Sequence, residues 1–199
     1  MGLKIYGVAQ SRAIRVLWMA HELDIPFEHV QQGFAGEKTA AYLAVNPNGR
    51  VPAIDDDGFK LWESLAINLY LARKHDRGLA PKDSKEDALA MQWSLWVMTE
   101  VEKSLLNAMF FTRGIMGNPK DPARAAGYMA ELQKPLAVLD GCLAGKEYLM
   151  GNRFSVADLN VASVLSWAPG AKLDLAAFTH LNAWLTRCLS RPALARARG

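Results

Sequence analysis

The chain is poor in cysteine and has no long apolar run. Its 199 residues include two cysteines, Cys142 and Cys188, which are far apart. This usage predicts two free thiols in a reducing compartment, so we expect a cytoplasmic protein. No apolar stretch approaches the roughly 20 residues that cross a bilayer, and the first residues lack the pattern of a signal peptide. We therefore expect neither a disulfide framework nor a membrane segment.

The chain also lacks a concentration of charge of one sign. It carries 23 basic and 20 acidic residues, for a formal net charge of +3, and the basic residues are spread along the sequence. The locally basic end, residues 191–198, is explained by a solvated C-terminal helix. A surface that binds nucleic acid needs a much stronger basic patch, so we expect no nucleic-acid partner.

Strands and helices alternate over the first 77 residues. Residues 3–6 and 27–30 read as strands around a helix that starts near Arg12, which predicts a βαβ unit with parallel strands. A short helix follows near residues 39–44, then a hairpin that turns at residues 55–58, then a helix from Ser64. This order, β-α-β-α-β-β-α, predicts a small mixed sheet in a thioredoxin-like domain over residues 1–77.

The rest of the chain reads as helix. Residues 77–82 break the pattern and form the expected linker, so we predict a second, all-helical domain over residues 83–199. A long amphipathic helix should run from Asp83 or Ser84 to about residue 112. Asp121 and Pro122 begin another, kinked at Pro135, that reaches about residue 143. The fold class is therefore α/β plus all-α.

A local folding signal lies near the start of a later helix. Ser155 and Asp158 have the spacing of a capping box, and Phe154 and Leu159 stand where a hydrophobic staple would be. We assign these residues to folding and not to chemistry. Removal of Asp158 should cost about 1 kcal/mol, as the loss of a helix cap does.

Several kinds of chemistry have no residues to support them. The four histidines show no metal-ligand spacing and neither cysteine has a partner at such spacing, which argues against zinc, and we expect no metal. No nucleophile elbow or phosphate-binding glycine loop is present. A thioredoxin-like redox enzyme carries C-x-x-C at the start of its first helix, but residues 10–13 here are Gln-Ser-Arg-Ala.

Glu63 and Ser64 stand at the start of a helix, where a ligand can bind. The hydroxyl of Ser64 and the free N–H groups of a first turn bind a carboxylate readily, and Glu63 could hold an ammonium group. Together they suit the α-amino-acid end of a small molecule. The alternative is that Ser64 only caps the helix while Glu63 favours its dipole. A cis Val51–Pro52 bond would leave the Val51 backbone free to pair with a bound peptide.

Ser11 lies at the end of the first strand-to-helix loop. No base stands near it in the sequence, so we do not expect it to act as a nucleophile. Its hydroxyl and the N–H groups of the helix start could stabilise a bound thiolate. The alternative is that Ser11 is only a helix cap.

Four stretches of the chain together resemble the cytosolic glutathione S-transferase superfamily. They are residues 11–18 (SRAIRVLW), 46–53 (NPNGRVPA), 61–67 (LWESLAI) and 151–158 (GNRFSVAD). The resemblance covers the whole chain and is nearest to serine-type, theta-like and bacterial members, because a serine stands four residues before Arg15. It implies the glutathione S-transferase fold, a homodimer and glutathione as co-substrate.

The resemblance also implies a site. Ser11 would hydrogen-bond the glutathione sulfur, Val51 beside a cis Pro52 would pair with the cysteinyl backbone, and Glu63 and Ser64 would hold the γ-glutamyl end. Arg50 and Lys38 are candidates for the glycyl carboxylate. The family's acceptor pocket lies between the domains, and our candidates for it are Met109, Phe110, Phe111 and Trp167. Aromatic residues and methionines at helical spacing are more often plain core, which is the alternative for each of them.

Tyr6 is a rival to Ser11, because many family members use a tyrosine. It falls inside the first predicted strand, so we interpret it as structural. The expected reaction is attack of the glutathione thiolate on a small hydrophobic electrophile. A glutathione-dependent isomerase or peroxidase on the same fold, and a non-catalytic interaction module, are the alternatives.

Overall fold

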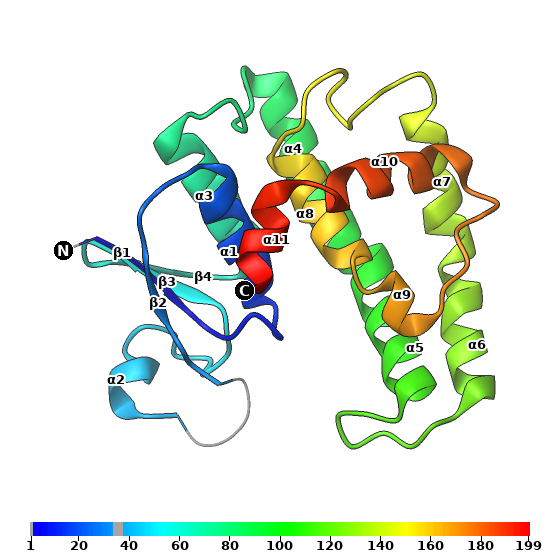
Figure 1. Ribbon diagram of the computed structural model, residues 1–199, viewed down its shortest axis with the longest axis horizontal. Coiled ribbons are helices and arrows are strands. Elements are labelled where there is room, and N and C mark those ends of the chain that lie inside the picture. The colour runs from blue at the N-terminus through cyan, green and yellow to red at the C-terminus, as the bar shows by residue number, and fades with distance from the viewer. Residues whose placement is uncertain (1, 34–37) are drawn as a thin grey trace. The chain divides into compact units, whose positions relative to one another are not determined.

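The computed structural model describes residues 2–33 and 38–199, and these form two compact units. The first unit holds residues 1–81 and 190–199, and the second holds residues 82–189. The last ten residues therefore differ from the expectation that the helical domain extends to residue 199. The reason is that helix α11 (Pro192–Arg198) packs along α1 (Ala13–Glu22), as Figure 1 shows. Arg191 adds a bidentate ion pair to Glu22, with two N–O distances of 2.7 Å.

The first unit contains the expected mixed sheet. Strands β1 (Leu3–Tyr6), β2 (Glu28–Val30), β3 (Ala53–Asp56) and β4 (Phe59–Trp62) lie in the order β2-β1-β3-β4. β1 is parallel to β2, and β3 is antiparallel to both β1 and β4. The parallel pair confirms the βαβ unit, and the order of the elements confirms the thioredoxin-like arrangement.

The β3–β4 hairpin follows from its turn residues. Asp57 and Gly58 have φ of 53° and 94°. Two consecutive positive φ values are those of a type I′ turn, whose twist matches that of the strands, and Asp-Gly is among the sequences that adopt it. Asp55 Oδ1 accepts a hydrogen bond from the N–H of Gly58 at 2.7 Å and holds the turn.

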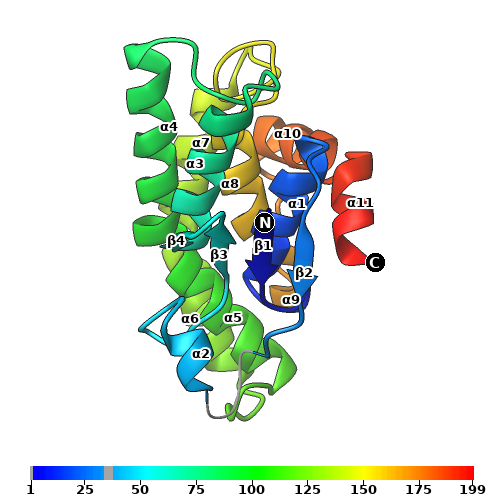
Figure 2. The same cartoon turned by 90° about the vertical axis from the view of Figure 1, so that its left-hand side faces the viewer.

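Among the described residues of the first unit, three helices lie beside α11. They are α1, the short α2 (Ala40–Leu43) and α3 (Ser64–His75), and α1 packs against α3. Figure 2 shows these helices from the side of the sheet. Ile5 and Ile54 of the sheet, Val16 of α1, and Ile67 and Leu71 of α3 are completely buried, so one apolar core holds the strands and both helices together.

The second unit is helical throughout its regular structure. The helix expected from residue 84 to about 112 is present as three consecutive segments, with a π-helical stretch between two α-helices. The helix expected from 122 to 143 is divided at Leu132, and Pro135 falls in the first turn of the second part, where proline is tolerated. The segments are α4 (Ser84–Trp96), η1 (Val97–Glu102), α5 (Lys103–Arg113), α6 (Pro122–Glu131), α7 (Gln133–Leu143), α8 (Val156–Leu165), α9 (Ala168–Ala171) and α10 (Thr179–Leu189).

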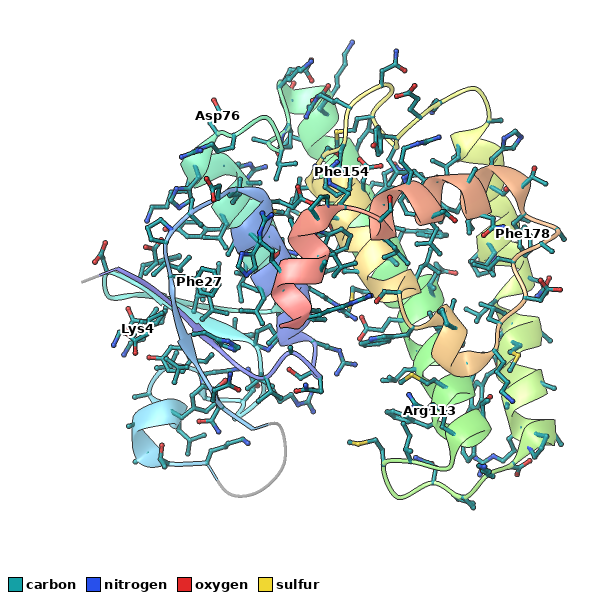
Figure 3. All side chains as sticks on the ribbon, viewed as in Figure 1. Lys4, Phe27, Asp76, Arg113, Phe154 and Phe178 are labelled. Atoms are coloured by element: carbon teal, nitrogen blue, oxygen red, sulfur yellow. The ribbon has the colours of Figure 1, made fainter. Side chains whose placement is uncertain are left out.

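The start of α8 carries the capping box predicted from the sequence. Asp158 is completely buried and accepts hydrogen bonds from the N–H and the hydroxyl of Ser155, at 3.0 and 2.7 Å. It also accepts from the N–H of Leu149 at 2.8 Å and from the indole of Trp184 at 2.9 Å. Burial outweighs these bonds and raises the pKa of the Asp158 carboxyl. Figure 3 shows Phe154, which is also buried, just ahead of this helix.

The helices of the described residues are all too short or too polar to cross a membrane.

Candidate functional site

Three connecting segments meet at one edge of the sheet, the edge formed by the last residues of β1 and β4 and the first residue of β3. Tyr6, the last residue of β1, is paired with Ala53, the first residue of β3. Ala53 is also paired with Trp62, the last residue of β4. The loop after β1, the segment before β3 and the start of α3 after β4 therefore lie at the same edge. These are the segments that carry the predicted site residues.

Gly7 brings two of these segments into contact. Its φ is 135°, in the region that favours glycine. A Cβ atom at this position would lie 2.5 Å from Cβ of Ala13, 3.2 Å from Cβ of Val51 and 3.6 Å from Oγ of Ser11. A side chain at residue 7 would therefore separate the Ser11 loop from the Val51 segment. We did not predict a role for Gly7 from the sequence, although a glycine directly after a strand is a signal for close backbone approach.

Ser11 is half-buried in the turn that precedes α1. Its hydroxyl donates to the carbonyl of Val8 at 2.7 Å and accepts from the N–H of Ala13 at 3.1 Å. The second bond satisfies one of the free N–H groups at the helix start, although the N-cap of α1 is Arg12 and not Ser11. A hydroxyl hydrogen rotates to suit its partner, so this capping bond leaves the hydroxyl able to donate elsewhere.

The Val51–Pro52 peptide bond is cis, as the predicted site requires. The carbonyl of Arg50, one residue earlier, accepts hydrogen bonds from the Tyr42 hydroxyl at 2.6 Å and from the Asn46 side chain at 2.7 Å. Burial raises the pKa of Tyr42 to about 12, so this phenol keeps its hydrogen. Two donors thus hold the segment before β3 in place.

Glu63 and Ser64 form the junction between β4 and α3. Glu63 is exposed and has a φ of 74°, which is uncommon for a residue with a side chain. Ser64 is the first residue of α3, and only 4% of its surface is exposed. Arg15 of α1 is completely buried and donates from Nη1 to the Ser64 hydroxyl over a long 3.4 Å. Arg15 joins the Ser11 side of the site to the Ser64 side, a role that we did not assign from the sequence.

The two candidates for the glycyl carboxylate lie in neighbouring loops. Arg50 is exposed, directly ahead of Val51. Lys38 donates from Nζ to the carbonyl of Gly33 at 2.5 Å. Its stem lies beside Gly49, where a Cβ atom would be 3.3 Å from Cγ of Lys38. The Lys38 stem therefore lies next to the loop that carries Arg50.

The four candidates for the acceptor pocket belong to the second unit, and Phe111 and Met109 among them face different helices. Phe111 is buried and its ring is stacked on Tyr128 of α6, with centroids 6.0 Å apart. The guanidinium of Arg124 lies 4.1 Å from the same ring. Met109 faces α9 instead, because a Cβ atom on Gly170 would lie 2.9 Å from its sulfur. Phe110 of α5 and Trp167, just before α9, are both half-buried.

Tyr6 is half-buried and packs against the core of the first unit. It pairs with Val30 and Ala53 in the sheet, and its ring lies 5.6 Å from that of Tyr42. It packs against a cluster of Tyr42, Val45, Val51 and Ala53. These contacts agree with the structural role that its strand position predicted.

Comparison with known proteins assigns both units to one family. The model described as "Glutathione S-transferase, N-terminal domain" matches residues 1–73, and "Glutathione S-transferase, C-terminal domain" matches residues 105–192. A glutathione S-transferase of Hyoscyamus muticus is 34% identical and is aligned over 99% of this chain and 98% of that protein. One of Silene vulgaris is 33% identical over 97% and 95%.

The solved structures agree. The theta class glutathione S-transferase of Xanthomonas axonopodis pv. citri, with glutathione bound, superposes with a TM-score of 0.89 at 32% identity. The superposition covers 98% of this chain and 96% of that one.

Proposed function

The chain belongs to the glutathione S-transferase family, and we propose that glutathione binds at the sheet edge where Ser11, Val51 and Ser64 meet. The protein is a glutathione transferase. The reaction is nucleophilic attack of the glutathione thiolate on an electrophile. The observation that carries the proposal is the convergence of the Ser11 loop, the Val51 segment and the start of α3 at one edge.

Ser11 stabilises the thiolate. A thiol with a pKa near 8.5 is only a few per cent ionised at pH 7, and lowering that pKa by about two requires roughly 2.7 kcal/mol. A hydrogen bond to a charged group supplies about 1.5 to 3 kcal/mol, and the start of α1 adds a smaller amount. To donate to the sulfur, the hydroxyl must turn its hydrogen from the carbonyl of Val8. The bond from Ala13 N–H can stay in place during this rotation.

The remaining groups hold the tripeptide. Val51 pairs through its backbone with the cysteinyl residue, as an added strand would. Ser64 and the first N–H groups of α3 bind the carboxylate of the γ-glutamyl group, and Glu63 binds its ammonium group. Arg50 binds the glycyl carboxylate together with Lys38, whose stem lies beside Gly49 in the loop that carries Arg50.

A small apolar electrophile is the acceptor. The residues that we propose for its pocket are Met109, Phe110, Phe111 and Trp167, and the ring of Phe111 is stacked on Tyr128 of α6. The protein contributes proximity and thiolate stabilisation, and neither requires a covalent enzyme intermediate.

We further propose that the protein is a homodimer. β4 is an edge strand of the sheet, and Phe59 and Trp62 on it are 50% and 39% exposed. Large apolar side chains on an exposed edge strand favour pairing with another copy.

The Ser11→Ala variant tests the role of Ser11. It should raise the pKa of bound glutathione by about 1 to 2, which is the value of one hydrogen bond to a charged group, and should slow turnover in proportion at pH 7. The titration is followed by the ultraviolet absorbance of the thiolate in the complex. Ser84→Ala, at an exposed serine at the start of α4, is the matched control. An unchanged titration in Ser11→Ala would reject the assigned role.

A further inference from the structure

Arg15 is a fully buried charge beside the proposed site. It lies in the first turn of α1, none of its surface is exposed, and it donates to the hydroxyl of Ser64. Burying a guanidinium is costly, and the cost is recovered only through hydrogen bonds and a nearby negative charge. An anion bound at Ser64 would add a negative charge to the groups that already surround Arg15.

The bond from Arg15 decides what the Ser64 hydroxyl can do. A serine hydroxyl has one hydrogen to donate and two positions at which it accepts. Because Arg15 occupies one accepting position, the hydrogen of Ser64 is directed to another partner. A hydroxyl that accepts a hydrogen bond from a charged group is also polarised by that group. The polarisation strengthens the hydrogen bond that the hydroxyl donates. Ser64 is thereby prepared to donate to an anion at the start of α3.

We propose that Arg15 is a positioning residue that sets the Ser64 hydroxyl as a donor to the α-carboxylate of the γ-glutamyl group. This rests on the proposed function, because it assumes that glutathione binds at this edge. Arg15 also places a positive charge near the carboxylate, and a guanidinium is the cationic group best suited to a buried position of this kind. Arg15 therefore acts through Ser64. It affects the affinity for glutathione and not the ionisation of the glutathione sulfur.

A purely structural role for Arg15 makes a different prediction. If Arg15 only joined α1 to α3, its replacement would weaken the binding of every ligand of the site to the same extent. A positioning role affects only ligands that carry the carboxylate. The informative probe is therefore glutathione whose glutamyl α-carboxylate has been converted to an amide, compared with glutathione itself.

The experiment measures the dissociation constants of both tripeptides by titration calorimetry. The unmodified protein should bind glutathione at least about tenfold more tightly than the amide, which is the value of one hydrogen bond between charged or polarised groups. Arg15→Leu should reduce the ratio of the two dissociation constants to about two or less. It should weaken the binding of glutathione and leave the binding of the amide nearly unchanged. Arg15→Lys keeps the positive charge but lacks the planar guanidinium, so it should retain part of the preference for glutathione over the amide.

Two further variants separate the role of Arg15 from a loss of folding and from a general loss of positive charge. Ser64→Ala should reduce the ratio of the dissociation constants as far as Arg15→Leu does. This variant tests the proposal even if Arg15→Leu does not fold. Arg73→Leu removes one positive charge from the exposed last turn of α3 and should leave the ratio unchanged.

The outcomes separate this inference from the proposed function. If the unmodified protein binds neither tripeptide, the proposed function fails. If it binds both equally, or if the Arg15 variants keep the full ratio, the role of Arg15 is overturned while the glutathione site stands.

Discussion

Glu63 combines a strained backbone with a proposed binding role. Its φ of 74° lies in the region that glycine adopts easily and other residues adopt at a cost of about 1 to 3 kcal/mol. Such conformations persist where the surrounding structure holds them, and they are frequent at ligand sites. Here the residue is held between the end of β4 and the start of α3. The strained backbone and the carboxylate can be tested separately at this one position.

We predict that two substitutions at Glu63 differ in their effect on stability but have the same effect on binding. Glu63→Ala and Glu63→Gly both remove the carboxylate and should weaken glutathione binding by about tenfold, the value of one charged hydrogen bond. Glu63→Gly also relieves the strained φ, so it should melt about 2 to 4 °C higher than Glu63→Ala. Calorimetric titration and thermal unfolding of both variants measure the two effects.

Unaltered affinity in both variants would remove Glu63 from the site. Equal melting temperatures would show that its backbone conformation carries no cost.

At the scale of elements, the start of α8 is more than a helix cap. The sequence showed the spacing of Ser155 and Asp158, and from that spacing alone we expected a loss of about 1 kcal/mol on removing Asp158. In the folded unit, the same carboxylate also accepts from Leu149 and from Trp184 of α10. It therefore joins α8 both to the preceding loop and to a second helix, and its contribution should be correspondingly larger.

We predict that Asp158→Ala lowers the free energy of unfolding by about 4 kcal/mol, since it removes four hydrogen bonds worth about 1 kcal/mol each. Asp140→Ala is the matched control, because Asp140 accepts one bond, from the N–H of Leu181 at 2.8 Å. That variant should lose only about 1 kcal/mol. Urea unfolding followed by tryptophan fluorescence measures both, and equal losses would contradict the wider role of Asp158.

At the scale of the whole molecule, the response to acid depends on a carboxylate that joins the sheet to a helix. Asp56 of β3 is buried and accepts hydrogen bonds from Tyr70 and Lys74 of α3, at 2.7 and 2.5 Å. Burial opposes its ionisation, but the bonds from Lys74 and Tyr70 outweigh burial and lower the pKa of the Asp56 carboxyl below 3.8. A lowered pKa means that the folded state holds the proton less tightly than the unfolded state. The stabilisation is therefore complete above about pH 4 and is lost as the pH falls through the folded-state pKa.

We predict that Asp56→Asn lowers the free energy of unfolding at pH 7 by about 1 to 2 kcal/mol, allowing for the partial exposure of Lys74. The difference from the unmodified protein should shrink as the pH is lowered from 4 to 3. Urea unfolding at a series of pH values measures it. Asp57→Asn, at an exposed carboxylate in the adjacent turn, controls for the loss of one charge. A difference that stays constant down to pH 3 would contradict the assignment to Asp56.

The sequence by itself determined the features that depend on neighbouring residues. The Asp57-Gly58 turn, the capping box at Ser155 and the order of the strands and helices follow from local conformational preference and hydrophobic periodicity. Ser11 and Pro52 of the proposed site could be named in the same way, because a serine before a helix and a proline before a strand are visible in the sequence.

The tertiary structure alone decided which distant residues meet. The approach of the Ser11 loop to Val51 at Gly7, and the burial of Arg15 against Ser64, depend on strand pairing and on the packing of α1 against α3. The placement of α11 on α1 and the packing of Phe111 against Tyr128 likewise depend on which apolar faces become covered. Hydrophobic burial has no directional preference along the chain, so a pattern shows that a face will be buried but not against which partner.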